Sequence, residues 1–198
     1  MKLLVVTGFL GSGKTTLIRT LGKECEKLGK RVAIIVNEAG TTSPSKDILK
    51  RDGLNAEDLK GCCICPGTAA KFEKILRRME KELRPDIFLI EAFGTTTPNA
   101  IKTVIESIRG KTQQKLGSLP MVTLIDCSRE EPFNKAIELI GAQVREADIV
   151  LLNKVDLVTD SQLKNIESRI RKIKPDASLM RTVASEGRGI DRLLDLLN

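Results

Sequence analysis

Residues 8–16 read Gly-Phe-Leu-Gly-Ser-Gly-Lys-Thr-Thr, a combination of glycines, one lysine and hydroxyls that suits the binding of a phosphate chain. Gly8 and Gly13 bracket a tight turn without obstructing side chains, so backbone N–H groups can converge on an anion at a helix N-terminus. Lys14 adds a point charge at the β- and γ-phosphates, and the hydroxyl of Thr15 is a Mg²⁺ ligand. The predicted phosphate-binding residues are Gly11, Ser12, Gly13, Lys14, Thr15 and Thr16.

A second polar motif, at residues 153–156, reads Asn-Lys-Val-Asp and matches the N-K-x-D pattern of guanine sites. The Asp156 carboxylate can accept hydrogen bonds from guanine N1–H and the 2-amino group, a donor pair that adenine lacks. Lys154 lays its stem over the ring, and Asn153 braces the loop. We also expect a backbone N–H of Val183-Ala184 to reach the guanine oxygen. The two motifs together predict GTP or GDP as ligand.

An acidic residue, Glu91, follows the apolar run Ile87–Ile90 and precedes Gly94 by three positions. Nucleotide-binding proteins with a phosphate loop place an acid that orders Mg²⁺ at the end of such a strand. The N–H of a nearby glycine can sense the γ-phosphate. Glu91 is therefore the predicted magnesium-side acid beside Thr15, and Gly94 the predicted γ-phosphate contact.

Three of the five cysteines, Cys62, Cys63 and Cys65, fall within four residues. In an extended loop Cys63 and Cys65 point the same way and offer two thiolates to a soft or borderline cation such as Zn²⁺, Ni²⁺ or Co²⁺. Cys62 joins them only if the turn bends. Buried small hydrophobes and a redox pair are the alternatives, and the clustering beside a polar segment favours metal. Cys25 and Cys127 are expected to be packing residues.

Composition limits the function classes. The chain of 198 residues carries 33 Lys and Arg against 26 Asp and Glu, a net charge of +7 that suits an anionic ligand or an acidic partner. Basic residues are spread along helical faces and Trp and Tyr are absent, so nucleic acid is not an expected partner. The absence of histidine excludes His-based metal sites, Ser-His and Cys-His nucleophile pairs and a histidine base.

We expect one α/β domain over residues 1–198. No apolar run approaches membrane-spanning length, and Met1-Lys2 leads directly into the first predicted strand without a leader. The expected location is therefore the cytoplasm, with no membrane partner, and the cysteines are expected to be thiols or metal ligands, not a disulfide framework.

Buried apolar runs alternate with amphipathic segments along the chain. The predicted strands are residues 3–6, 31–36, 87–90, 121–125, 149–152 and 178–183. The predicted helices are residues 17–28, 72–83, 99–109, 132–146, 160–173 and 190–197. Residues 41–60 are predicted to be a mobile loop with at most short helical pieces, and residues 110–119 a second loop. This alternation predicts a mostly parallel sheet covered by helices on both faces, with ligands at the carboxyl ends of its strands.

The chain resembles the CobW/HypB/UreG family of P-loop GTPases, which deliver metals or assemble metallocentres. Residues 8–16 resemble the CobW-type loop, residues 36–40 its V-N-E-F-G segment, residues 91–94 with Pro98 its E-x-x-G stretch, and residues 153–156 its guanine motif. The resemblance covers nearly the whole chain and implies a three-layer P-loop NTPase domain.

Two features depart from CobW proteins. Where they carry G-C-x-C-C, this chain has Gly61-Cys62-Cys63-Ile64-Cys65-Pro66, so Cys63-Ile64-Cys65 matches, Cys62 is additional and Pro66 replaces the last cysteine. The chain also stops where a CobW-type C-terminal domain would begin, so no such domain is expected. Its size is closer to HypB and UreG, although it lacks the histidines that those proteins use for nickel.

The resulting hypothesis is a Mg²⁺-dependent GTPase switch of low intrinsic rate that couples nucleotide state to metal insertion or metalloenzyme maturation. By resemblance, Asp47 is the predicted group that places the hydrolytic water, and Glu38 is the alternative. One chain offers at most three cysteine ligands, so a GTP-dependent homodimer is expected to complete a four-ligand site.

Three other functions fit parts of the sequence. A GTPase chaperone for a cofactor-dependent client, such as a corrinoid protein, would need no metal of its own. A small-molecule kinase would also use a phosphate loop, but the sequence shows no arginine-rich lid and no second substrate pocket. A redox-sensing scaffold would use the thiols without binding metal.

Overall fold

The computed structural model describes residues 1–38, 43–59, 64–109, 117–129 and 136–198. Its seven-stranded sheet has the order β3-β2-β4-β1-β5-β6-β7, and every pair of neighbouring strands is parallel. The strands are β1 Lys2–Gly8, β2 Val32–Val36, β3 Asn55–Asp58, β4 Ile87–Glu91, β5 Gly117–Asp126, β6 Ile149–Asn153 and β7 Ser178–Thr182. The α-helices are α1 Lys14–Lys27, α2 Pro44–Arg51, α3 Ala69–Leu83, α4 Pro98–Ile108, α6 Ile137–Glu146, α7 Asp160–Ile173 and α8 Asp191–Leu197. Two 3₁₀ turns are η1 Pro66–Thr68 and η2 Val155–Leu157.

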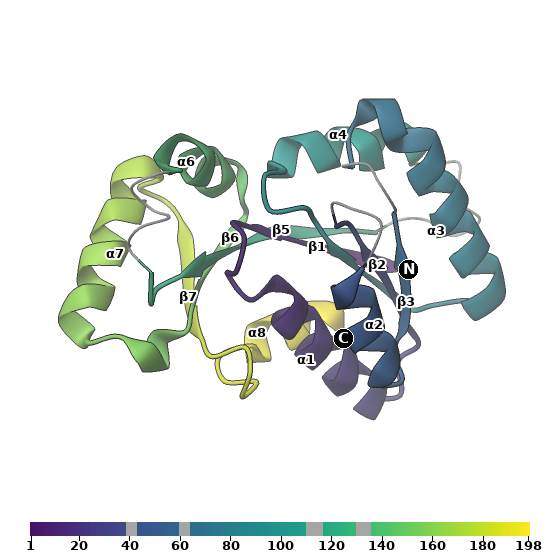
Figure 1. Ribbon diagram of the computed structural model, residues 1–198, viewed down its shortest axis with the longest axis horizontal. Coiled ribbons are helices and arrows are strands. Elements are labelled where there is room, and N and C mark those ends of the chain that lie inside the picture. The colour runs from purple at the N-terminus through teal and green to yellow at the C-terminus, as the bar shows by residue number, and fades with distance from the viewer. Residues whose placement is uncertain (39–42, 60–63, 110–116, 130–135) are drawn as a thin grey trace.

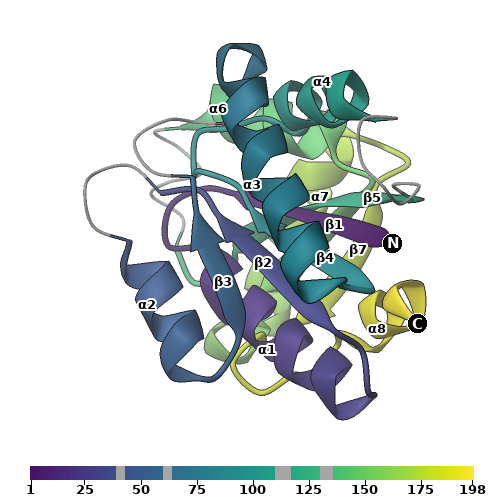
Figure 2. The same cartoon turned by 90° about the vertical axis from the view of Figure 1, so that its right-hand side faces the viewer.

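Helices cover both faces of the sheet, as the sequence predicted (Figures 1 and 2). One face packs against α1, α2 and α8, through residues such as Leu17, Leu49 and Leu193. The other face packs against α3 and α4 on one side, and α6 and α7 cover the part of the sheet near β6. Alternate residues of β1 serve the two faces, because side chains alternate along a strand. The three-layer α/β architecture is thereby confirmed. No helix in the described ranges is long and apolar enough to cross a membrane.

The parallel register brings the carboxyl ends of the central strands to one edge of the sheet. Val6 of β1 lies opposite Glu91 of β4, and Asp126 of β5 lies opposite Asn153 of β6. Polar groups that are distant in sequence therefore meet at this edge, where a doubly wound sheet binds its ligands.

Residues 41–60 were predicted to be a loop with at most short helical pieces, and the described part, 43–59, agrees only in part. The two-turn helix α2 is such a short piece, but the edge strand β3, which pairs with β2, was not predicted. Pro44 fits the first helical turn because that position needs no N–H donor. Gly53, at a φ of 85°, makes the turn into β3. The strand was missed because its four residues are polar or small and carry no apolar run.

Among the other predicted boundaries, two differ most. Residues 117–119, assigned to the second loop, belong to β5, whose start pairs Gly117 with Lys2 of β1. The helix predicted over 132–146 is described from Ile137, and residues 132–135 lie outside the described ranges.

Leu49 fixes α2 to the core, so Leu49→Ala should lower the free energy of unfolding by about 2–4 kcal/mol. The leucine is fully buried, whereas its neighbour Ile48 is 42% exposed. Ile48→Ala is therefore the matched control and should change stability by less than about 1 kcal/mol. Urea unfolding of both variants measures the difference, and equal losses would contradict this account of α2.

Candidate functional site

The loop between β1 and α1 has the backbone that a phosphate cradle requires. Gly8, Gly11 and Gly13 all have positive φ, at 131°, 80° and 100°. A Cβ on Gly8 would lie 2.4 Å from the Leu124 carbonyl oxygen, and one on Gly13 would lie 2.4 Å from Asn153 Nδ2. Glycine is therefore required at both positions by backbone conformation and by close packing.

Lys14 begins α1 and folds back over this loop. Its Nζ donates to the carbonyl oxygens of Gly8 at 2.9 Å and Phe9 at 3.3 Å. Burial lowers the pKa of Lys14, and the nearby carboxyl groups of Glu91 and Glu38 oppose that shift. The ammonium group thus lies at the phosphate loop, hydrogen-bonded to two neutral carbonyl groups.

Thr15 and Glu91, predicted as the magnesium-side pair, are in direct contact. Thr15 Oγ1 lies 2.7 Å from Glu91 Oε1, at the end of β4. Glu91 is 5% exposed, and its buried Oε2 has no hydrogen-bond partner among the described residues. A hydroxyl and an unpartnered carboxylate oxygen are the hard ligands that Mg²⁺ prefers. The residues present therefore fit a magnesium ion.

Ser45, which the sequence analysis did not single out, belongs to the same group. Its Oγ lies 3.0 Å from Thr15 Oγ1 and also donates to Glu38 Oε1. Glu38 accepts further hydrogen bonds from Ser43 Oγ at 2.9 Å and from the Ser45 amide at 3.1 Å. The contact of Ser45 with Thr15 joins residues 30 positions apart, so no local sequence signal could have revealed it.

The protonation of Glu91 follows from its surroundings. Burial raises the pKa of Glu91 to about 7, against hydrogen bonding from Thr15 and the charge of Lys14, while Glu38 adds to the rise. Thr15 donates its hydrogen to Glu91 Oε1, so its contact with Ser45 Oγ uses a lone pair of Thr15 Oγ1.

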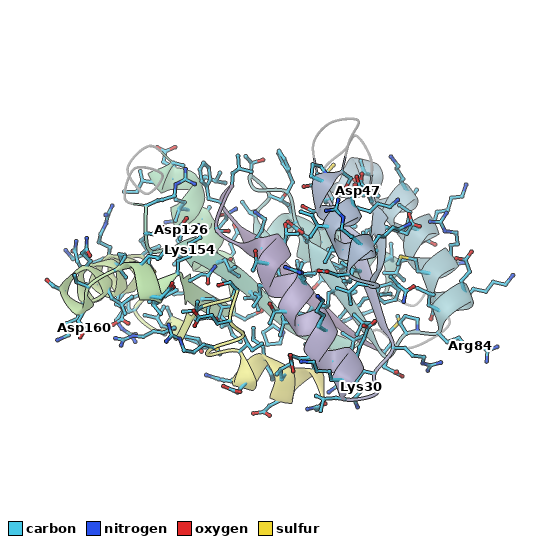
Figure 3. The ribbon with its side chains drawn as sticks, turned by 60° about the horizontal axis from the view of Figure 1, so that its bottom comes forward. Lys30, Asp47, Arg84, Asp126, Lys154 and Asp160 are labelled. Carbon is cyan, nitrogen blue, oxygen red and sulfur yellow. The ribbon has the colours of Figure 1, made fainter. Side chains whose placement is uncertain are left out.

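The predicted guanine motif contacts the phosphate loop through two side chains. Asn153 Nδ2 donates to the Ser12 carbonyl at 2.8 Å, and Lys154 Nζ donates to the Gly11 carbonyl at 3.0 Å. Lys154 also pairs with Asp126 at 2.6 Å, an acid for which the sequence analysis proposed no role (Figure 3). Asp156 follows in η2 and is exposed, so its carboxylate is accessible to a base.

The amides of Val183 and Ala184 are already bonded within the protein. Val183 N–H donates to the Arg188 carbonyl at 3.0 Å, and Ala184 N–H donates to Asn153 Oδ1 at 3.0 Å. This geometry argues against their predicted role as donors to the guanine oxygen. The next amide, of Ser185, has no hydrogen-bond partner among the described residues and is the better candidate.

The remaining predicted nucleotide residues fall into two groups. Gly94 lies against the loop, since a Cβ there would be 3.1 Å from the Leu10 amide nitrogen, and Thr16 lies in the first turn of α1. Asp47 is exposed on α2 (Figure 3). The structure thus brings Gly94 to the site and leaves Asp47 at its outer side.

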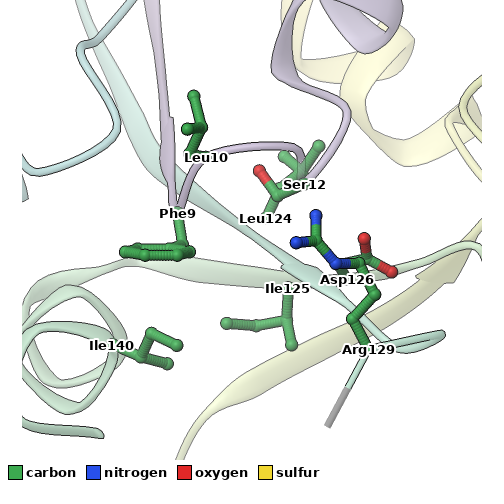
Figure 4. A pocket seen from close by; sticks show the side chains of 8 residues that line it. All are labelled: Phe9, Leu10, Ser12, Leu124, Ile125, Asp126, Arg129 and Ile140. Atoms are coloured by element: carbon green, nitrogen blue, oxygen red, sulfur yellow. The ribbon is translucent and has the colours of Figure 1, made fainter. Parts of the chain in front are cut away.

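Arg129 is a further residue that the sequence analysis missed. Figure 4 shows it with Asp126 and Ser12 around a pocket beneath the phosphate loop. A Cβ on Gly11 would lie 2.7 Å from Arg129 Nη1, so the guanidinium group packs directly on the loop. A third cation therefore stands near the phosphate site with Lys14 and Lys154.

The cysteine prediction is described only in part. Cys62 and Cys63 lie outside the described residues. Cys65 is half-buried before η1, with its Sγ 3.7 Å from Thr68 Oγ1. Within the described ranges, no three Cys, Asp or Glu side chains are grouped closely enough to hold a metal ion. Cys25 and Cys127 are buried, which fits packing, and burial raises their thiol pKa values to about 11 and about 12.

A phosphate loop, a buried acid at the end of a neighbouring strand and an N-K-x-D motif at the same sheet edge define a P-loop nucleotide-binding domain with a guanine-type motif. Residues 2–181 match the model of a protein family described as "CobW/HypB/UreG, nucleotide-binding domain". The chain belongs to this family, which confirms the resemblance seen in its motifs.

Relatives and solved structures agree with this placement. Zinc-regulated GTPase metalloprotein activator 1 of Schizosaccharomyces pombe is 31% identical over 202 residues, covering 97% of this chain and 48% of that protein. Zinc chaperone CobW of Sinorhizobium sp is 32% identical over 196 residues, covering 84% of this chain and 54% of that protein. The chain therefore spans about half the length of these curated relatives. Helicobacter pylori HypB in complex with nickel shares the fold, with a TM-score of 0.69, 18% identity and coverage of 98% of this chain and 84% of that chain.

The raised pKa of Glu91 predicts a pH-dependent stability. Between its usual 4.5 and about 7, folded Glu91 holds a proton that the unfolded chain has released, so stability falls as pH rises through this window. Glu91→Gln has no carboxyl group to titrate, so the variant should not lose stability in this pH window. The variant's free energy of unfolding, relative to wild type, should rise by about 2 kcal/mol from about pH 5 to about pH 8 without nucleotide.

Urea unfolding at both pH values measures this change, with the exposed Glu106→Gln as control. A difference between Glu91→Gln and wild type that stays constant with pH would contradict the buried-carboxyl account.

Proposed function

We propose that the chain is a Mg²⁺-dependent GTP-binding and GTP-hydrolysing switch that acts in metal delivery or metalloenzyme maturation. The observation that carries this proposal is the contact of Asn153 and Lys154 with Ser12 and Gly11, which joins the base-recognition motif to the phosphate loop. Base and phosphates can then occupy one continuous site. Relatives named as zinc chaperones and as a zinc-regulated GTPase support the biological role.

In the proposed reaction the protein positions groups and stabilises charge, and it forms no covalent intermediate. Lys14 leaves the carbonyls of Gly8 and Phe9 and turns to the β- and γ-phosphates. Thr15 and Glu91 hold the magnesium ion, which supplies positive charge against the phosphate oxygens when it is bound. Loop amides bind the remaining oxygens. Asp47 is the proposed water-positioning group and Glu38 the alternative, with Glu38 the closer of the two to Thr15 through Ser45.

The proposed cargo is a thiophilic divalent metal held by Cys65 with Cys62 and Cys63. Zinc is the first choice because relatives are named zinc chaperones, and Ni²⁺ and Co²⁺ suit the same donors. A tetrahedral site needs four ligands, so we propose a homodimer formed with GTP that pools thiolates from two chains. The client is then a metalloenzyme or a corrinoid protein, and the proposed location is the cytoplasm.

Lys14→Ala should abolish tight GTP binding and leave the fold intact, because it removes the buried cation held at the phosphate loop. Isothermal titration with GTP measures the affinity, and circular dichroism checks the fold. Lys102→Ala changes an exposed lysine on α4 and should bind GTP as wild type does. An unchanged affinity in Lys14→Ala would refute the phosphate-loop assignment.

Asp156→Asn should weaken GTP by about 1.5–3 kcal/mol, or roughly tenfold to more than a hundredfold, since it loses charge-assisted hydrogen bonds to guanine. It should improve xanthosine triphosphate, because an amide can donate to the oxygen that replaces the 2-amino group. Competition between the two nucleotides measures the switch, with the exposed Asp195→Asn as control. Equal affinity of the wild type for ATP and GTP would argue against guanine recognition.

A further inference from the structure

The first turn of α2 is held at the magnesium side of the site by hydrogen bonds of Ser45, while Lys46 in the same turn pairs with Glu57 of β3 at 3.2 Å. Ser45 is 6% exposed, and its hydroxyl lies between Thr15 Oγ1 and Glu38 Oε1. Leu49, one turn later, is anchored in the apolar core. The helix thus has a fixed apolar face and a polar N-terminal end whose position depends on Thr15 and Glu38.

Glu38 links this helix end to β2. It accepts hydrogen bonds from Ser43 Oγ, Ser45 N and Ser45 Oγ, and it stands directly after Asn37 at the end of β2. Figure 2 shows α2 beside β3, next to β2 in the sheet. A displacement of the first turn of α2 would therefore displace Glu38 and, with it, the end of β2.

Asn37 links the same strand end to the segment that carries Cys65. Its N–H donates to the Glu91 carbonyl at 3.0 Å, and its Oδ1 accepts from Ile64 N–H at 3.1 Å. Asn37 is 2% exposed, and Ile64 is fully buried in the core beneath α3 and α4. The position of Ile64, and of Cys65 after it, is therefore set from the end of β2.

From these contacts we propose that Ser45 and the pair Asn37-Glu38 form a hydrogen-bonded link that reports the state of Thr15 to the Ile64-Cys65 segment. Ser45 is a positioning residue in this link. The inference rests on the proposed function, and it assigns the residues through which nucleotide and cysteine segment communicate.

The direction of the response follows from the number of hydrogen bonds that the Thr15 hydroxyl can make. Thr15 Oγ1 now serves both Glu91 at 2.7 Å and Ser45 at 3.0 Å. Thr15 donates its one hydrogen to Glu91, so a cation beside the phosphates would take up the lone pair that Thr15 offers to Ser45. The contact with Ser45 is then given up. The first turn of α2 leaves Thr15, Glu38 shifts with it through its bonds to Ser43 and Ser45, Asn37 follows, and Ile64 loses a fixed partner, so the Cys65 thiol becomes more accessible.

Alkylation of Cys65 by a maleimide, resolved by mass spectrometry, tests this link. The buried Cys25 and Cys127, at 1% and 2% exposure, serve as internal controls in every sample. The wild type is compared without nucleotide, with Mg·GDP and with Mg²⁺ plus a non-hydrolysable GTP analogue. The variants are Ser45→Ala, Ser45→Thr, which keeps the hydroxyl, and Ser161→Ala, an exposed serine on α7.

In wild type we expect the GTP analogue to raise the Cys65 rate about fivefold or more, as coupled sites typically do. Ser45→Ala should show the raised rate without nucleotide and lose the response, and it should bind the analogue more tightly because a competitor for Thr15 is gone. Ser45→Thr and Ser161→Ala should behave as wild type. A general loosening of the fold would also expose Cys25 and Cys127.

The link is refuted if Ser45→Ala labels Cys65 at the wild-type rate without nucleotide and keeps the full response. A wild type that binds no GTP by titration would defeat the proposed function instead. In that case the comparison of nucleotide-free wild type with Ser45→Ala still decides the link.

Discussion

The candidate site depends most on the side-chain amide of Asn153. Its nitrogen holds the Ser12 carbonyl and its oxygen holds the Ala184 amide, so one side chain joins the ends of β1, β6 and β7. A Cβ on Gly13 would lie 2.4 Å from this amide nitrogen, so the contact requires a glycine at that position. An amide is well suited to this position because it donates and accepts at once, whereas a carboxylate would face the Ser12 carbonyl with a second acceptor. Hydrogen bonds within the protein therefore hold the phosphate loop and the guanine motif in a fixed relative position.

The other side of the site is organised by charge. Glu91 and Glu38 both lie close enough to affect Lys14 and each other, and burial disfavours the charged form of Glu91 and of Lys14. The hydroxyls of Thr15 and Ser45 stand between the two acids and separate them with hydrogen bonds. These hydrogen bonds offset the repulsion between the two carboxyl groups, and Glu91 Oε2, which has no partner within the described ranges, is available to a cation.

The sequence predicted those parts of the site that consist of a few consecutive residues. The glycine loop and the N-K-x-D motif each lie within a few consecutive residues, and Glu91 follows a plain apolar strand, so their types and order indicated their position at the sheet edge. The strand β3 escaped because an edge strand of four residues needs no apolar run. Ser45 and Arg129 escaped because their roles arise from contacts with Thr15 and Gly11, which are distant in sequence. The bond of the Ala184 amide to Asn153 was hidden for the same reason, because Asn153 lies 31 positions earlier in the sequence.

The hydrogen bonds of Lys14 stabilise the phosphate loop and leave the lysine able to turn to an anion. A buried ammonium group without acceptors would be costly, and here the carbonyls of Gly8 and Phe9 supply them. These are neutral partners, so a phosphate offers a stronger, charge-assisted hydrogen bond to the same hydrogens. Exchange of partners then needs only a rotation of the lysine side chain, while the loop stays fixed by Asn153. The glycine at position 11 leaves room for Arg129 beside it, so positive charge surrounds the phosphate site without occupying it.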